Sequence, residues 1–117
     1  MKVLFILNDP PYGTERSYNG LRLAMNVQKM EEEAEVTVFL MADGVFCAKQ
    51  GQNTPNGFYN IERMLKGVRG HKGTILLCGT CMDARGLKAE ELMEGARRST
   101  MDELTTLTLD ADKVLVF

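Results

Sequence analysis

Four short, predominantly apolar runs set the strongest limits on what this chain can fold into. They occupy residues 3–7, 36–41, 74–77 and 113–117. The first, VLFIL, is apolar throughout and is ended by an Asn-Asp-Pro-Pro turn, a pattern typical of a strand covered on both faces in a parallel sheet. We therefore expect the four runs to be strands of one sheet.

Amphipathic segments separate these runs. Apolar residues spaced by three and four predict helices over residues 15–32, 59–68 and 100–109. Thr14 is the expected N-cap of the first helix, and Gly70 or Gly73 is expected to end the second. Less regular segments complete the pattern: short helices over 45–49 and 88–93, a loop over 50–57 and a further strand over 96–99.

Strands that alternate with helices predict an α/β fold, here a three-layer α/β/α sandwich with a mainly parallel sheet of about five strands. A chain of 117 residues suits one compact domain with one core. We therefore assign residues 1–117 to a single domain.

Composition narrows the function classes. The net charge is −2 and the basic residues are scattered, which does not favour a nucleic-acid partner. The apolar run at residues 3–7 is too short for a signal-peptide core or a membrane span, so we expect a soluble, cytoplasmic protein with no membrane partner. Three cysteines, an odd number, argue against a secreted disulfide scaffold. We therefore expect the cysteines to be free thiols, whose reactivity depends on their surroundings.

Polar and sulfur-containing residues follow three of the predicted strands. In a parallel sheet the carboxyl ends of the strands share one edge, where loops diverge and ligands bind. Asn8 and Asp9 follow the first run, Asp43 follows the second, and Cys78 follows the third. We expect these residues to shape one pocket.

Cys78 and Cys81 form a Cys-x-x-Cys pair where the third apolar run stops. A working cysteine reacts as the thiolate, so its pKa must be lowered by a helix N-terminus or a cation. Arg85 and Lys88 are near enough in sequence to supply positive charge, and Asp83 would act in the opposite sense.

The simplest alternative makes Cys78 only the last apolar residue of a buried strand. Cys81 lies in a turn-like stretch with no strand interior to fill, which favours a chemical role for the pair over a packing role. The pair could be a redox dithiol or could carry sulfur as a persulfide. Met82, like Met41, could line an apolar pocket beside it.

Metal and cofactor sites find little support. A structural zinc site needs four ligands, and Cys47 and His71 are the only additions to the pair, at spacings typical of no zinc motif. Cys47 is interpreted as a packing or interface residue. His71 falls at the opposite end of the third strand from the pair, as a solvated loop residue. The segment after the first strand lacks the glycines of a dinucleotide loop and the lysine of a P-loop, so we expect no cofactor.

Several blocks together, in order and spacing, resemble one protein family. They cover nearly the whole chain: Pro11-Tyr12-Gly13, Leu21-Arg22-Leu23-Ala24, Phe39-Leu40-Met41-Ala42-Asp43, Tyr59-Asn60-Ile61, the cysteine segment, and Ala111-Asp112-Lys113-Val114-Leu115. The chain resembles the DsrE/DsrF-like sulfur-relay superfamily, and within it the YchN-like group. The resemblance implies a three-layer α/β fold and small rings, either trimers or paired trimers forming a hexamer.

The resemblance also implies a role for Cys78. Relay members carry a persulfide on a cysteine at the end of a central strand, followed after a fixed interval by an Arg-Gly pair. Here these positions are Cys78 and Arg85-Gly86. Cys81 has no counterpart in relay members but fits the YchN-like pattern.

We therefore expect a sulfur-carrier or sulfurtransferase-like protein that meets sulfur donor and acceptor proteins. Cys78 would be the nucleophile, Cys81 the resolving or assisting thiol, and Arg85 the stabilising cation. A non-catalytic oligomeric module and a redox dithiol protein are the alternatives.

Overall fold

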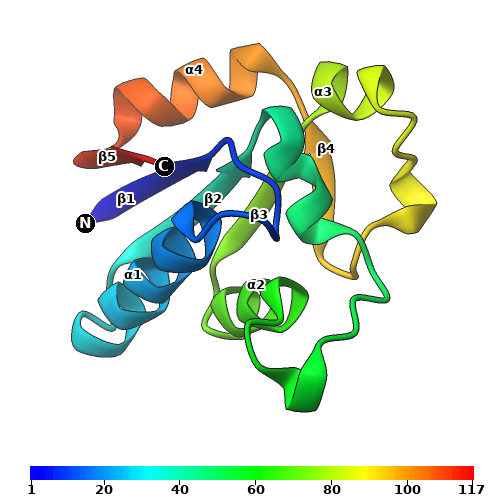
Figure 1. Cartoon of the computed structure of the whole chain (residues 1–117). Helices are drawn as coiled ribbons and strands as arrows, with labels where there is room; N and C mark the ends of the chain where they lie inside the picture. The colour runs from blue at the N-terminus through cyan, green and yellow to red at the C-terminus, as the bar shows by residue number, and fades with distance from the viewer.

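The computed structural model describes all residues from 1 to 117 and contains one five-stranded sheet surrounded by helices (Figure 1). The strands are β1 (Lys2–Leu7), β2 (Glu35–Leu40), β3 (Thr74–Cys78), β4 (Ala96–Ser99) and β5 (Lys113–Val116). The α-helices are α1 (Arg16–Met30), α2 (Ile61–Gly70), α3 (Gly79–Ala84) and α4 (Met101–Asp110). Three short 3₁₀ helices lie between them: η1 (Ala42–Ala48), η2 (Pro55–Gly57) and η3 (Ala89–Glu91).

The sheet has the order β4-β3-β2-β1-β5, and every neighbouring pair is parallel. Leu7 pairs with Leu40, and Cys78 pairs with Ser99, so the carboxyl ends of the strands lie along one edge. This confirms the predicted α/β fold. None of the helices combines the length and the apolarity that a membrane crossing requires.

The two faces of the sheet carry cores of different size. Helices α1 and α2 cover one face, where 20 buried residues form a single cluster. Helix α4 crosses the other face, where the buried cluster has only five residues: Leu4, Phe39, Leu76, Cys78 and Leu104 (Figure 1). Cys78 therefore lies in the thinner layer.

Several element boundaries differ from those predicted. The first helix begins at Arg16 with Glu15 as its N-cap, so Thr14 is not the cap. The Thr14 hydroxyl instead accepts the Arg16 N–H at 3.4 Å and donates to the Asp9 carboxylate at 2.9 Å. The helix ends at Met30, before the acidic run at 31–33, where negative side chains in a last helical turn would be unfavourable because of the helix dipole.

The second helix is shifted later than predicted. It begins at Ile61 because the side chain of Asn60 accepts the N–H of Arg63 at 3.0 Å and so caps it. It ends at Gly70. Gly73 lies beyond the helix, where a methyl group would be 2.6 Å from the carbonyl oxygen of Val68, so only glycine fits there.

Two short segments also differ. Residues 79–84 form α3, although the sequence there reads as a turn, because six residues are too few to show helical periodicity. The helix predicted over 88–93 is reduced to the single 3₁₀ turn η3.

Gly44 fixes the loop that follows β2. Its N–H donates to the carbonyl oxygens of Met41, at 2.8 Å, and Asn8, at 3.2 Å. A methyl group at this position would lie 2.3 Å from the carbonyl oxygen of Leu7. The absence of a side chain at Gly44 therefore lets the loop after β2 pack directly on the end of β1.

Candidate functional site

The cysteine pair lies at the junction of β3 and α3. Cys78 is the last residue of β3 and the N-cap of α3, and its Sγ accepts the N–H of Cys81 at 3.4 Å. The apolar run stops at Cys78 because the next residues begin a helix whose first free N–H groups need an acceptor. The two cysteines are therefore joined by a hydrogen bond across the helix N-terminus, and both are free thiols.

A second peptide N–H points at the pair from the loop after β2. Ala42 donates its N–H to Sγ of Cys81 at 3.2 Å. Ala42 has φ = 51°, a left-handed conformation that costs a non-glycine residue about 1 kcal/mol or more. The fold therefore holds Ala42 in an unfavourable backbone conformation at the position where its N–H donates to the thiol of Cys81. The sequence carries no signal for this contact.

The two sulfurs differ in burial. Cys78 is 8% exposed, whereas Cys81 is half-buried. Burial raises the pKa of Cys78, and the hydrogen bond between its thiol and the Cys81 side chain raises it further, while the N–H groups of Cys81 and Thr80 act in the opposite direction. A lowered pKa was expected for a working Cys78. In the isolated chain the raised pKa instead keeps this thiol protonated, and Cys81 is the more accessible sulfur.

Arg85 braces the loops around the pair. Its Nε donates to the Asp43 carboxylate at 2.7 Å, and its Nη1 donates to the carbonyl oxygen of Cys81 at 3.1 Å. These two bonds connect the loop after β2 to helix α3. The sequence-predicted residues Cys78, Cys81, Arg85 and Asp43 are therefore brought together, with Arg85 bonded to the backbone beside the thiols.

Arg98, on β4, is the cation that sequence reasoning missed. Its guanidinium forms two hydrogen bonds with the Asp83 carboxylate, at 2.7 and 2.9 Å. It lies over the residue that follows Cys78, since a methyl group at Gly79 would be 2.7 Å from its Nε. Asp83 raises the pKa of Arg98 most, and the charge of a Cys78 thiolate adds to this. Only the pairing of β4 with β3 brings Arg98 to this place.

Three other predicted pocket residues have different surroundings. The Asn8 side chain donates to the carbonyl oxygen of Phe117 at 3.1 Å, and the Asp9 carboxylate accepts a bond from Thr14 at the start of α1. Met82 is 1% exposed and belongs to the larger core on the other face of the sheet. Asn8 and Asp9 thus lie at the predicted sheet edge, while their side chains contact groups other than the cysteines.

The third cysteine serves packing. Cys47 is fully buried, and its Sγ donates to the carbonyl oxygen of Asp9 at 3.6 Å. Burial raises its pKa to about 12, and the Ser17 hydroxyl partly opposes this. His71 follows α2, at the far end of β3 from Cys78. No group of three or more His, Cys, Asp and Glu side chains in the structure is placed to hold a metal ion.

Comparisons with known proteins agree with this architecture. The sequence model of the DsrE/DsrF-like family matches residues 1–117. Protein YchN of Escherichia coli is 39% identical over 116 residues, covering 99% of this chain and 98% of YchN. MJ0989 of Methanocaldococcus jannaschii is 39% identical over 117 residues, covering both chains completely. The crystal structure of E. coli YchN superposes with a TM-score of 0.94 at 38% identity, covering 100% of this chain and 99% of that one.

A match to the family over the whole sequence, together with the close structural likeness to YchN, leads to one conclusion. The chain belongs to the DsrE/DsrF-like family.

Proposed function

We propose that this protein carries sulfur in an intracellular relay, with the sulfur held as a persulfide on Cys78. One observation carries the proposal: a Cys-x-x-Cys pair lies at the carboxyl edge of a parallel sheet, with one peptide N–H on each sulfur and a guanidinium beside the first cysteine. Membership of a family linked to sulfur relay supports it.

The loading step is a sulfur exchange without net oxidation. The sulfur of Cys78 attacks the outer sulfur of a persulfide on a donor protein, so that an S–S bond forms at Cys78 as the donor's S–S bond breaks. The proton of the Cys78 thiol passes to the donor's leaving thiolate. The added sulfur places the reactive atom about 2 Å beyond Sγ of Cys78, which is itself 8% exposed.

Cys81 assists this step by its position. The N–H of Cys81 donates to Sγ of Cys78 at 3.4 Å and can stabilise negative charge on this sulfur as it attacks. The N–H of Ala42 donates to Sγ of Cys81 and holds the second thiol beside the first. Arg85 fixes the backbone of Cys81 and therefore acts as a positioning residue.

Mass spectrometry tests the proposal. The full chain is incubated with a cysteine desulfurase and cysteine, and the expected product is one sulfur atom heavier, with the extra sulfur on the peptide that contains Cys78. Cys78→Ser should abolish the adduct. Cys47→Ala, which removes the buried packing cysteine, should leave it unchanged. Absence of an adduct, under conditions that load a known carrier, would contradict the proposal.

A thiol–disulfide redox role is the second candidate, and the closeness of the two cysteines favours it. The N–H of Cys81 lies 3.4 Å from Sγ of Cys78, so the two thiols are neighbours that a disulfide could join. Titration of the pair against glutathione separates the two roles. A midpoint near the cytosolic poise of about −220 to −320 mV would let the pair change between dithiol and disulfide and would indicate a redox role.

We also propose that the protein acts in the cytoplasm as a homo-oligomer, a trimer or hexamer, that meets sulfur donor and acceptor proteins. Three free cysteines suit a reducing compartment. Leu109 and Val116, on the thinly covered side of the sheet, are 84% and 61% exposed, which supports further burial there. Light scattering of the purified protein measures the subunit number.

If replacing both cysteines of the pair by serine left partner binding and phenotype intact, a non-catalytic module would be favoured.

A further inference from the structure

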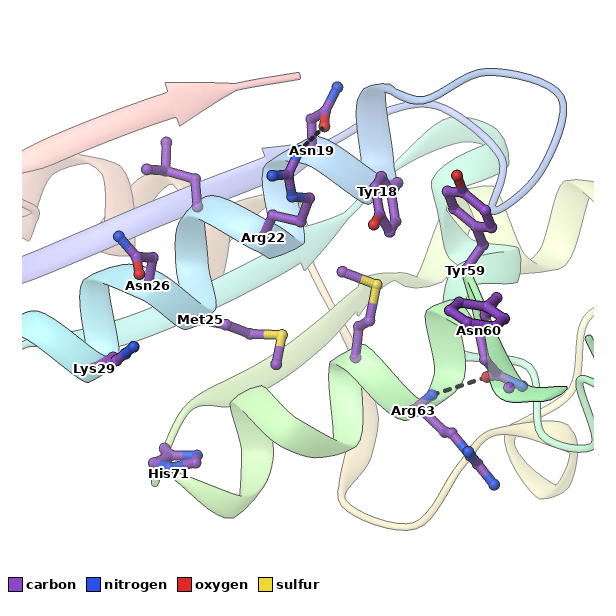
Figure 2. A pocket seen from close by; sticks show the side chains of 14 residues that line it. Tyr18, Asn19, Arg22, Met25, Asn26, Lys29, Tyr59, Asn60, Arg63 and His71 are labelled. Carbon is purple, nitrogen blue, oxygen red and sulfur yellow. Dashed lines mark hydrogen bonds between the residues drawn. The ribbon is translucent and has the colours of Figure 1, made fainter.

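The largest hollow of the molecule lies away from the cysteines, between α1 and α2 (Figure 2). Its volume is about 1100 Å³, and it is open along one side of the helix layer. Cys78 belongs to the small cluster on the opposite face of the sheet. The sulfur chemistry proposed above makes no use of this groove.

The walls of the groove are two helical stripes. Both stripes have the alternating spacing of four, three and four residues that lets a row of side chains receive another helix. They are Tyr18, Arg22, Met25 and Lys29 along α1, and Met64 and Gly67 of α2 with its capping residues Asn60 and His71. All of them except Gly67 line the hollow. A methyl group at Gly67 would lie 3.2 Å from Cε of Met25, so Met25 already packs against α2 at the floor. Figure 2 shows Met25 reaching across from α1.

The charged residues of the groove are all basic. Arg22, Lys29 and Arg63 line it, and no carboxylate does. None of the three forms an ion pair, whereas seven of the chain's 14 Lys and Arg residues do. The acidic run at residues 31–33 lies beyond the end of α1 and does not line the groove. A protein with a net charge of −2 therefore gathers unpaired positive charge along one hollow.

Apolar and aromatic side chains complete the lining. Leu23, Phe58 and Tyr59 are 41%, 69% and 58% exposed. The ring of Tyr59 lies 4.9 Å from that of Tyr18, between ring centres, and Tyr59 has a left-handed φ of 58°. Exposed apolar and aromatic side chains gathered on one surface are typical of an interaction site. Methionine side chains adapt to varied apolar partners, which suits a docking floor.

We propose that this groove binds an acidic amphipathic helix of a partner protein. Arg22 and Lys29 are seven residues apart on one helical stripe, a separation of about 10 Å. The partner helix would therefore carry carboxylates at positions i and i+7, to pair with these two cations, and apolar residues between them, to cover Met25 and the tyrosines. The inference does not depend on the sulfur-carrier function.

A synthetic helix provides the probe. The peptide has about 18 residues, enough for a stable helix when rich in Ala and Leu, with Glu at i and i+7 beside an apolar stripe. A matched peptide has Gln in place of each Glu. Calorimetry gives the affinity, and amide chemical shifts of the ¹⁵N-labelled full chain locate the site. We expect shifts confined to α1, residues 57–60 and α2, with binding by the Glu peptide at least about threefold tighter and weakened by salt.

Variants of the protein complete the test. The double variant Arg22→Gln and Lys29→Gln should weaken binding of the Glu peptide about three- to tenfold. Lys113→Gln, which removes another lysine without an ion pair, on β5 and outside the lining of the groove, should have no effect. Circular dichroism verifies that each variant is folded. Equal binding of the two peptides, shifts outside the groove, or no binding would overturn the proposal. So would loss of self-association in the double variant together with no peptide binding, because a second copy of the chain would then fill the groove.

Discussion

The peptide N–H of Ala42 lies 3.2 Å from Sγ of Cys81, and Ala42 adopts a left-handed conformation to place it there. The contact joins residues 39 positions apart, through a loop held on β1 by Gly44. This donor is fixed by the backbone, so it can stabilise a thiolate without a charged side chain.

Ala42 should tolerate glycine unusually well. Glycine reaches φ = 51° without the steric cost that alanine bears, and this gain offsets the greater freedom of glycine in the unfolded chain. We expect Ala42→Gly to leave the free energy of unfolding unchanged or to raise it by up to about 1 kcal/mol. Ala24→Gly, inside α1 and fully buried, should lower it by about 1 kcal/mol or more. Urea denaturation measures both, and equal losses would contradict the assigned strain.

Arg98 should control the reactivity of Cys78. Arg98→Gln removes a positive charge beside the thiol and leaves the Asp83 carboxylate unpaired, and both changes raise the pKa of Cys78. Alkylation of Cys78 by iodoacetamide at pH 8 should slow by about two- to fivefold. Arg97→Gln is the matched control, since the neighbouring Arg97 pairs with Glu103 instead. Equal slowing in both variants would show that Arg98 does not act on Cys78.

Gly44 should not accept a side chain. A methyl group at this position meets the backbone of β1 at 2.3 Å, and a backbone carbonyl cannot move aside cheaply. Gly44→Ala should destabilise the fold by about 2 kcal/mol and disturb the Ala42 donor. Gly70→Ala, at the end of α2 with open space around it, should be neutral or slightly stabilising. A thermal melt of each variant gives the comparison, and a stable Gly44→Ala protein would contradict the close approach.

Cys47 should make the fold sensitive to alkali. Its pKa is raised from 9.0 to about 12 in the folded state, so the native protein keeps a proton that the unfolded chain loses. The resulting stability is fully present below pH 9 and is lost as the pH rises toward 12. Between pH 9 and 10 the loss should approach about 1 kcal/mol.

Chemical denaturation at several pH values measures this dependence. Cys47→Ala should flatten the decline, whereas Cys81→Ala should leave it in place. An unchanged slope in Cys47→Ala would mean that other groups cause the alkaline loss.

The local pattern of apolar residues was sufficient to predict the strands of the sheet. The apolar runs at 3–7, 36–41 and 74–77 became β1, β2 and β3, because a strand buried on both faces must be apolar along its length. The helix boundaries were less accurate. Asn60 moved the start of α2 by two residues, since a cap depends on which backbone N–H its side chain reaches.

The sequence by itself determined the parallel sheet, the closeness of Cys78 and Cys81 and their place at the carboxyl edge of the sheet. These follow from periodicity and from the order of the elements along the chain. Only the tertiary structure decided what surrounds the sulfurs: the N–H of Ala42, the guanidinium of Arg98 and the burial that raises the pKa of Cys78. These contacts join residues far apart in the chain, and their geometry depends on strand register and backbone conformation, which a linear pattern of residue types does not specify.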